Sequence, residues 1–124
     1  MRAALFTLVV CAGILSVTSC KNNKPAREVA GTYTGAFSAE YNDSTFLLSD
    51  GFVVQVDELT KNSVSVLSTG FDQFELLVTW NGINVVRVDP DDPNVTKFEY
   101  IADEKRLLLD YEKDGNWAVF NGTK

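Results

Sequence analysis

The chain has 124 residues, and its 17 acidic residues outnumber its 11 basic ones, which gives a formal net charge of −6. This balance argues against nucleic acid as a partner, because sequence-independent binding to phosphates needs a basic patch. The chain contains no histidine, which excludes imidazole-based acid–base catalysis, histidine-activated nucleophiles and histidine-ligated metals. No other catalytic constellation stands out, so we expect no enzyme, no cofactor and no metal site.

Residues 1–19 have the pattern of a signal peptide. Arg2 supplies a positive charge, an apolar run covers Ala3–Leu15, and mostly small residues follow up to Ser19. An apolar run of about 13 residues fits a signal-peptide core and is too short to cross a bilayer of about 30 Å as a helix. We therefore expect residues 1–19 to be removed on export.

The end of this segment, Val17-Thr18-Ser19-Cys20, joins an aliphatic residue, two small residues and a cysteine. The run resembles the lipobox of bacterial lipoproteins. The resemblance implies that the Cys20 thiol receives diacylglycerol, that the chain is cut before Cys20, and that the lipid tethers the protein to a membrane. The alternative is an ordinary secretory signal with a chance cysteine at the cut.

The residues behind Cys20 predict which membrane holds the anchor. Lys21, rather than aspartate, follows the cysteine, and this favours the outer membrane under the sorting rule of enteric bacteria. In gut anaerobes, acidic residues close behind the cysteine look to be the signal for export to the cell surface. Here no acidic residue lies between Cys20 and Glu28. We therefore expect the periplasmic leaflet of the outer membrane rather than the cell surface.

The rest of the chain divides into a tether and one domain. Residues 20–29 are mostly polar and aperiodic, and we expect them to form a lipid-anchored tether. Cys11 would leave with the signal and Cys20 would carry lipid, so the domain has no disulfide and must be held by its core. Residues 30–124 have a usual length for a single domain.

Alternation of apolar and polar residues predicts strands throughout this domain. Phe74, Leu76 and Val78, for example, share one face of a predicted strand. Asn81-Gly82 predicts a two-residue type I′ turn, because both residues tolerate positive φ. About eight short strands predict an all-β, antiparallel fold, either an up-and-down barrel or a sandwich. The runs expected as strands are 31–37, 52–59, 63–67, 74–80, 83–88, 95–102, 106–111 and 117–122.

Two further motifs carry a family resemblance. The first predicted strand begins Gly31-Thr32-Tyr33-Thr34-Gly35, and the chain closes on Phe120-Asn121-Gly122-Thr123-Lys124. With the lipoprotein signal, these motifs resemble the small calycin-like, lipocalin-like lipoproteins of Gram-negative gut anaerobes. The resemblance implies an eight-stranded barrel. Tyr33 stands where lipocalins proper carry tryptophan, so their ligand chemistry is not carried over, and an avidin-like barrel is the alternative.

Three residues are candidates for sites outside the core. Trp80 and Trp117 lie beside predicted turns, where an indole can contact a sugar or a protein, although core packing is favoured for both. Asp43-Ser44-Thr45 matches a short signal for O-glycosylation of exported proteins in some Gram-negative anaerobes, which makes Ser44 a candidate acceptor.

The best candidate for a metal site is the acidic loop Asp89-Pro90-Asp91-Asp92-Pro93-Asn94. Calcium prefers several carboxylate and carbonyl oxygens, but this loop lacks the glycine and the terminal glutamate of an EF-hand. We expect an ordinary stiff loop.

These observations predict a lipid-anchored, non-enzymatic binding or accessory module. Its partner would be a protein, a glycan or a small apolar ligand. The alternative is an inhibitor lipoprotein against a hydrolase, such as a lysozyme or a protease, which would present a stiff loop such as Asp89–Asn94. A carrier of small ligands should instead contain a central cavity of at least about 300 Å³.

Overall fold

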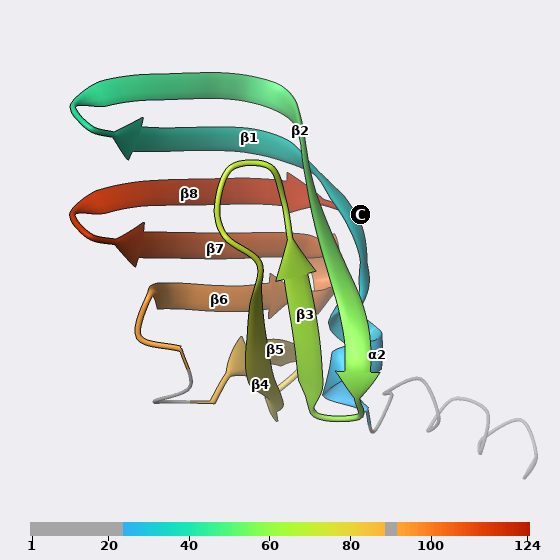
Figure 1. The fold of residues 1–124 in the computed structure, drawn as a ribbon. Coiled ribbons are helices and arrows are strands. Elements are labelled where there is room, and N and C mark those ends of the chain that lie inside the picture. Colours follow the sequence, from blue (N-terminus) through green and yellow to red (C-terminus); the bar gives the residue numbers. More distant parts are fainter. Residues whose placement is uncertain (1–23, 89–91) are drawn as a thin grey trace, which may run out of the picture.

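The computed structural model describes residues 24–88 and 92–124. Within them, antiparallel strands pair in chain order and close into an eight-stranded barrel, because the last strand returns to the first (Figure 1). The predicted all-β fold is confirmed, and it is a barrel rather than a sandwich. The strands are β1 (Gly31–Tyr41), β2 (Ser44–Thr60), β3 (Ser63–Leu67), β4 (Phe74–Asn81), β5 (Asn84–Arg87), β6 (Val95–Ile101), β7 (Arg106–Lys113) and β8 (Asn116–Thr123).

In the part of the chain that the structure describes, two short helices accompany the strands. The helix α2 (Pro25–Val29) precedes β1, and the 3₁₀ helix η1 (Ala102–Glu104) joins β6 to β7. Over residues 24–88 and 92–124, no helix is long and apolar enough to cross a bilayer. The predicted signal, the lipobox with Cys20, and Asp89–Asp91 lie outside the described residues.

Apolar side chains fill the barrel interior. In β4, Phe74, Leu76 and Val78 are buried while the residues between them are exposed, so the predicted faces of this strand are confirmed. Aromatic rings contribute much of the remaining volume. Phe37 and Phe52 stack at 3.9 Å between ring centroids. This core occupies the space that a carrier would leave for its ligand.

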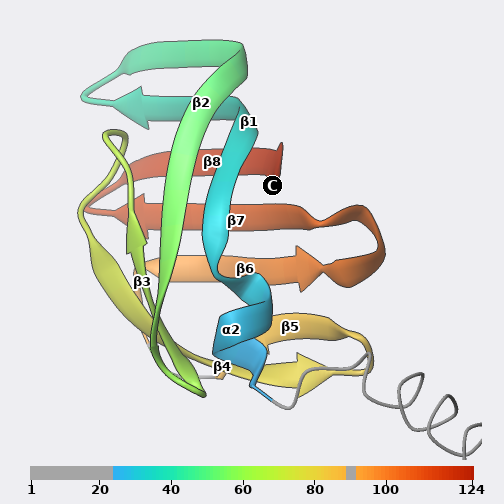
Figure 2. The ribbon, with the colours of Figure 1, turned by 90° about the vertical axis from the view of Figure 1, so that its right-hand side faces the viewer.

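The helix α2 covers one end of the barrel, which we call the closed end. Ala26 and Val29 are fully buried, and the Ala26 N–H donates to the Lys61 carbonyl at 3.0 Å. Figure 2 shows α2 lying between β1 and the β4–β5 hairpin. The sequence predicts a polar tether over residues 20–29, but residues 25–29 form a helix that packs against the barrel. Five residues are too few to display a helical period, and only the burial of Pro25, Ala26 and Val29 reveals their place in the fold.

The β1–β2 hairpin is longer than the sequence indicated. Its turn, Asn42–Asp43, has positive φ at both residues, as a type I′ turn requires. β2 then pairs with β1 along residues 44–48, shifts register, and continues into the barrel from Phe52. Gly51, with φ of 85°, lies at this shift, where β2 bends sharply (Figure 1). The strand expected at 52–59 is therefore only the second half of β2.

The β4–β5 hairpin corrects a second expectation. Asn81 pairs with Asn84, so the two turn residues are Gly82 and Ile83 rather than Asn81 and Gly82. Of the two turn residues, only Gly82 has positive φ, which fits a type II′ turn instead of type I′. The hairpin was predicted correctly, but its turn lies one residue later.

The seam that closes the barrel depends on two facing glycines. Gly35 of β1 is the partner of Gly122 of β8. A Cβ on Gly35 would collide with the Asn121 carbonyl oxygen, and one on Gly122 would lie 2.7 Å from the Thr34 carbonyl oxygen. Both obstacles are backbone atoms that cannot rotate away. The seam therefore closes without strain only with glycine on both strands.

Candidate binding pocket at the open end of the barrel

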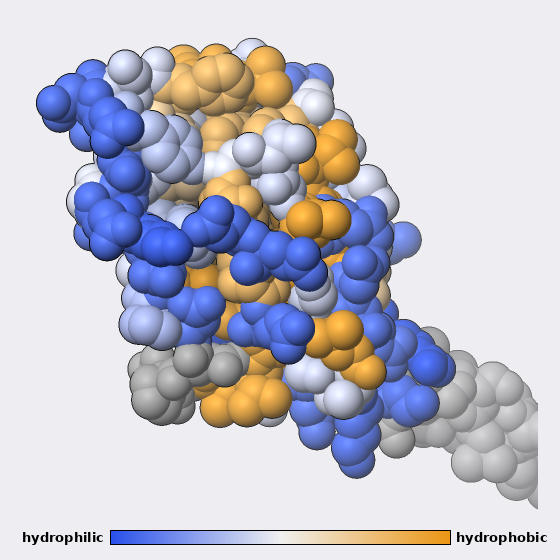
Figure 3. All heavy atoms as spheres, in the orientation of Figure 1, coloured by the Kyte–Doolittle hydropathy of each residue, from blue (hydrophilic) through white to orange (hydrophobic). Residues whose placement is uncertain are grey.

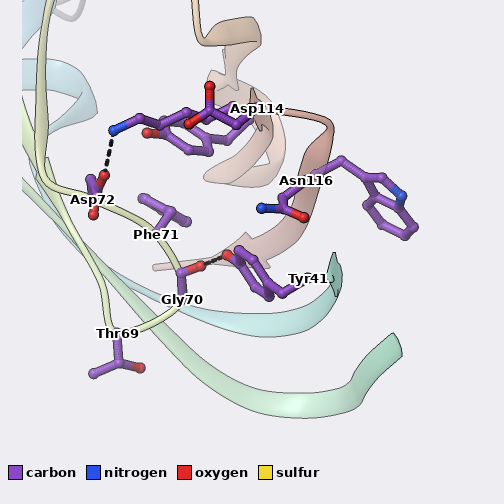
Figure 4. Close-up of a pocket in the computed structure, with 10 residues that line it drawn as sticks. Tyr41, Thr69, Gly70, Phe71, Asp72, Asp114 and Asn116 are labelled. Atoms are coloured by element: carbon purple, nitrogen blue, oxygen red, sulfur yellow. Dashed lines mark hydrogen bonds and ion pairs between the residues drawn. The ribbon is translucent and has the colours of Figure 1, made fainter. Parts of the chain in front are cut away.

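The end of the barrel opposite α2, which we call the open end, contains a pocket of about 480 Å³. Its walls come from three separate segments: the end of β1, the loop between β3 and β4, and the β7–β8 hairpin (Figure 4). The barrel brings these segments together although they are distant in the sequence. The lining residues are Tyr41, Thr69, Gly70, Phe71, Asp72, Tyr111, Lys113, Asp114, Asn116 and Trp117.

Stacked aromatic rings connect the pocket to the core. Phe71 stacks on Tyr111 with 5.4 Å between ring centroids, and Tyr111 stacks on Phe74 at 5.7 Å. Tyr111 and Phe74 belong to the buried core, whereas Phe71 is only partly buried. Packing against the barrel interior thus fixes the orientation of the pocket's aromatic wall.

Hydrogen bonds hold the β3–β4 loop and the hairpin tips in place. The Tyr41 hydroxyl points at Gly70 and donates to its carbonyl (Figure 4). The Gly70 N–H in turn donates to the Ser68 hydroxyl at 2.9 Å. Across the pocket, the Asn42 N–H donates to Oδ1 of Asn116 at 3.1 Å, which joins the β1–β2 tip to the β7–β8 tip. These contacts give the pocket a defined shape without a ligand.

The charges in the pocket nearly balance. Lys113 Nζ lies 2.9 Å from Asp72 Oδ2, and Asp114 adds a second carboxylate. Burial raises the pKa of both Tyr41 and Tyr111, and the nearby Asp72 carboxylate raises each further. Both tyrosines therefore keep their hydroxyl protons at neutral pH. The pocket offers hydroxyl, amide, ammonium and carboxylate groups beside aromatic rings.

The two tryptophans predicted as contact residues lie at opposite ends of the barrel. Trp117, in β8, is partly buried and lines the pocket. Trp80, near the end of β4 at the closed end, is partly buried and packs against the core. The geometry thus brings Trp117 to the pocket and separates Trp80 from it. Ser44, the candidate glycosylation site, is exposed at the start of β2.

The second half of the acidic loop is held against the barrel. The Asp92 carboxylate accepts the Asn94 N–H at 2.9 Å, and the Asp92 carbonyl accepts a hydrogen bond from Arg87 at 3.0 Å. Asp89 and Asp91 lie outside the described residues. Among residues 24–88 and 92–124, no group of three or more histidine, cysteine, aspartate or glutamate side chains could hold a metal ion.

Most of the pocket residues were not foreseen from the sequence. No sequence motif marks Tyr41, Phe71, Asp72 or Lys113. These residues come close together only because the barrel closes. No family model, curated protein or solved structure matches this chain. Its function is therefore inferred from the chemistry of the pocket.

Proposed function

We propose that this chain is a lipid-anchored, exported, non-enzymatic binding module, and that it holds part of a glycan in the open-end pocket. One observation carries the proposal. The pocket combines a fixed aromatic wall with several hydrogen-bonding side chains at the rim of a barrel whose interior is filled. The partner is thus taken to bind at the end of the barrel rather than inside it.

The chemistry of the lining favours a sugar over the other two predicted partner classes. A sugar ring presents an apolar C–H face, which packs on aromatic rings, and hydroxyl groups, which need both donors and acceptors. Phe71 and Tyr111 form the fixed aromatic wall. Trp117 and Tyr41 add aromatic surface, and Asn116 and Asp114 supply polar groups. A small apolar ligand would leave these polar groups buried without partners, which costs free energy.

The predicted anchor supports the same arrangement. Chain geometry allows the four residues Lys21–Lys24 to span at most about 14 Å between Cys20 and α2. Since α2 lies at the closed end, an anchor on Cys20 would hold that end near the membrane and turn the pocket away from it. The barrel also agrees with the calycin-like resemblance. We propose the outer membrane as its location, with the periplasmic leaflet preferred.

The binding proposal can be tested with the protein's own fluorescence. The chain has two tryptophans, so Trp80→Phe leaves Trp117 as the only indole. Titration with soluble oligosaccharides, including chitin, xylan, starch and peptidoglycan fragments, should give a saturable change in Trp117 emission for at least one of them. Calorimetry should then show binding at least about tenfold weaker in Trp117→Ala, which is about 1.4 kcal/mol, and unchanged binding in Trp80→Phe.

Two outcomes would contradict the proposal. One is the absence of saturable binding across the panel. The other is binding that Trp117→Ala leaves unchanged, which would place the ligand elsewhere. Inhibition of a lysozyme or a protease by the domain, equally strong in Trp117→Ala, would favour the inhibitor alternative instead.

The anchor is tested separately. Cys20→Ala should abolish lipid attachment, so the protein should be released from the membrane fraction or accumulate uncut. Mass spectrometry should show a lipid-sized increase in the mass of the amino-terminal peptide when Cys20 is present and no such increase in Cys20→Ala. Normal membrane retention of Cys20→Ala would refute the lipoprotein assignment and leave the pocket proposal untouched.

A further inference from the structure

The first half of β2 has one open edge. β2 pairs with β1 along most of its length, but its pairing with β3 begins only at Gln55. β3 ends at Leu67, where the chain turns into the loop that forms the pocket. Among the described strands, none pairs with Ser44–Val54 on this second side, and Figures 1 and 2 both show the edge at the periphery of the barrel.

This open edge is apolar. Phe46 is 51% exposed, Leu47 is 75% exposed and Leu48 is 36% exposed. An apolar patch is visible over this part of the molecule in Figure 3. Edge strands are usually protected by lysine, by proline or by charges, because an open row of backbone groups invites another strand. Ser44–Ser49 contains no charged residue and no proline, so the strand is available for pairing.

The turn fixes which backbone groups face outward. In a hairpin with a two-residue turn, the flanking residues, here Tyr41 and Ser44, form a hydrogen-bonded pair. Hydrogen-bonded and non-hydrogen-bonded pairs then alternate along the strands. Thr45 and Leu47 therefore direct their N–H and C=O groups away from β1 and toward the open edge. An incoming antiparallel strand would bond to these two residues.

We propose that the occupant of this edge is a second copy of the same chain, paired antiparallel through β2 with the twofold axis at Leu47. The segment is self-complementary in this register. Leu47 meets itself on the outer face, and Phe46 meets Leu48 of the second copy on the inner face. The twofold axis makes the Phe46–Leu48 pair occur twice, while the Leu47 pair lies on the axis itself.

Charge favours this face over others as the self-contact. The chain carries a net charge of −6, so most surfaces would bring carboxylates together when two copies meet. In the register centred on Leu47, the nearest carboxylate, Asp50, faces Ser44 of the second copy. No carboxylate faces another across the paired segment. The apolar, uncharged run Ser44–Ser49 is thus suited to a partner of its own sequence.

A cysteine on the twofold axis tests the pairing directly. Paired residues of antiparallel strands have Cα atoms about 5.5 Å apart, which is within the range for a disulfide. Leu47→Cys in the full chain, oxidised in native membranes, should give a disulfide-linked dimer. Leu77→Cys is the control, because Leu77 is also exposed but lies on β4, which is paired on both sides. The chain without either substitution shows how much cross-linking Cys11 and Cys20 give by themselves.

A charge at the axis provides the second test. Leu47→Asp would place two carboxylates opposite each other, so sedimentation of the detergent-extracted protein should shift from dimer to monomer. Leu77→Asp should stay dimeric, and circular dichroism should show both variants folded. The proposal is refuted if Leu47→Cys cross-links no more than Leu77→Cys, if it cross-links only to a different protein, or if folded Leu47→Asp remains dimeric.

Discussion

The two ends of the barrel use similar residues for different purposes. At the closed end, the Tyr33 hydroxyl donates to the Val29 carbonyl and the Tyr100 hydroxyl donates to Glu28 Oε2 at 3.2 Å. Lys124 Nζ lies 4.8 Å from the centre of the Tyr100 ring. At the open end, Tyr41 and Trp117 instead border a pocket. Aromatic residues under α2 complete the core, whereas those at the rim form a surface.

Coverage, rather than composition, separates a structural aromatic residue from one available for binding. Tyr33 is fully buried, and its ring meets Tyr100 edge-on at 6.2 Å. Tyr41 is 37% exposed although its hydroxyl is also bonded to a backbone carbonyl. Substitutions at the closed end should therefore affect stability, and substitutions at the open end should affect binding.

The largest expected contrast is between Tyr33→Ala and Trp117→Ala. Removing a fully buried ring should lower the free energy of unfolding by about 3–5 kcal/mol, because it leaves a cavity and deprives the Val29 carbonyl of its donor. Trp117→Ala should cost about 1 kcal/mol or less, since the indole is only partly buried. Urea unfolding followed by circular dichroism measures both. Similar losses for the two variants would contradict the division between the ends.

A pair of glycines gives a second contrast in stability. Gly122→Ala should lower the free energy of unfolding by about 1–3 kcal/mol, because its Cβ would meet backbone at the β1–β8 seam. At the open end, Gly115 has φ of 80° and open space around its Cβ position. Gly115→Ala should therefore cost only about 1 kcal/mol, from the positive φ alone. Thermal melts of both variants test this order, and a costlier Gly115→Ala would reverse it.

Much of the barrel could be predicted, because each half-buried strand shows its burial in its own sequence, as Phe74, Leu76 and Val78 do in β4. The first half of β2 could not, since Phe46, Leu47 and Leu48 are consecutive apolar residues with no alternation. The helix α2 is too short to show a period. The pocket was missed for a different reason: Tyr41 and Asp72 meet only through barrel closure. Trp117, nominated because it lies beside a predicted turn, lines the pocket, and its contact role stays a prediction.

The next contrast depends on pH. Burial first, and then the nearby Glu28 carboxylate, raises the pKa of Tyr100 from 10.0 to about 12. Between these values the unfolded chain loses the phenolic proton while the folded chain keeps it, so stability must fall as the pH rises. We expect a loss of about 1–2 kcal/mol from pH 10 to 12 attributable to Tyr100. In Tyr100→Phe, the free energy of unfolding should fall less steeply between pH 10 and 12. A fall as steep as in the unsubstituted chain would contradict this assignment.

The smallest expected effect concerns the ion pair at the pocket. Lys113 and Asp72 form a contact of 2.9 Å, but their side chains are 47% and 73% exposed. Water screens such pairs, and many contribute nothing measurable to stability. Lys113→Gln should therefore leave the melting temperature unchanged at physiological salt. A clear drop would show that the open end supports the fold more than its exposure suggests.

The central claim is that the open end binds while the closed end holds the fold together. The most direct measurement is an NMR titration of the isotopically labelled protein with the oligosaccharide that binds best in the fluorescence screen. We predict amide shift changes at residues 41, 69–72 and 111–117, with the amides of residues 25–33 and 98–106 unchanged. Changes concentrated around α2 and the closed end, with the pocket residues unaffected, would contradict the account.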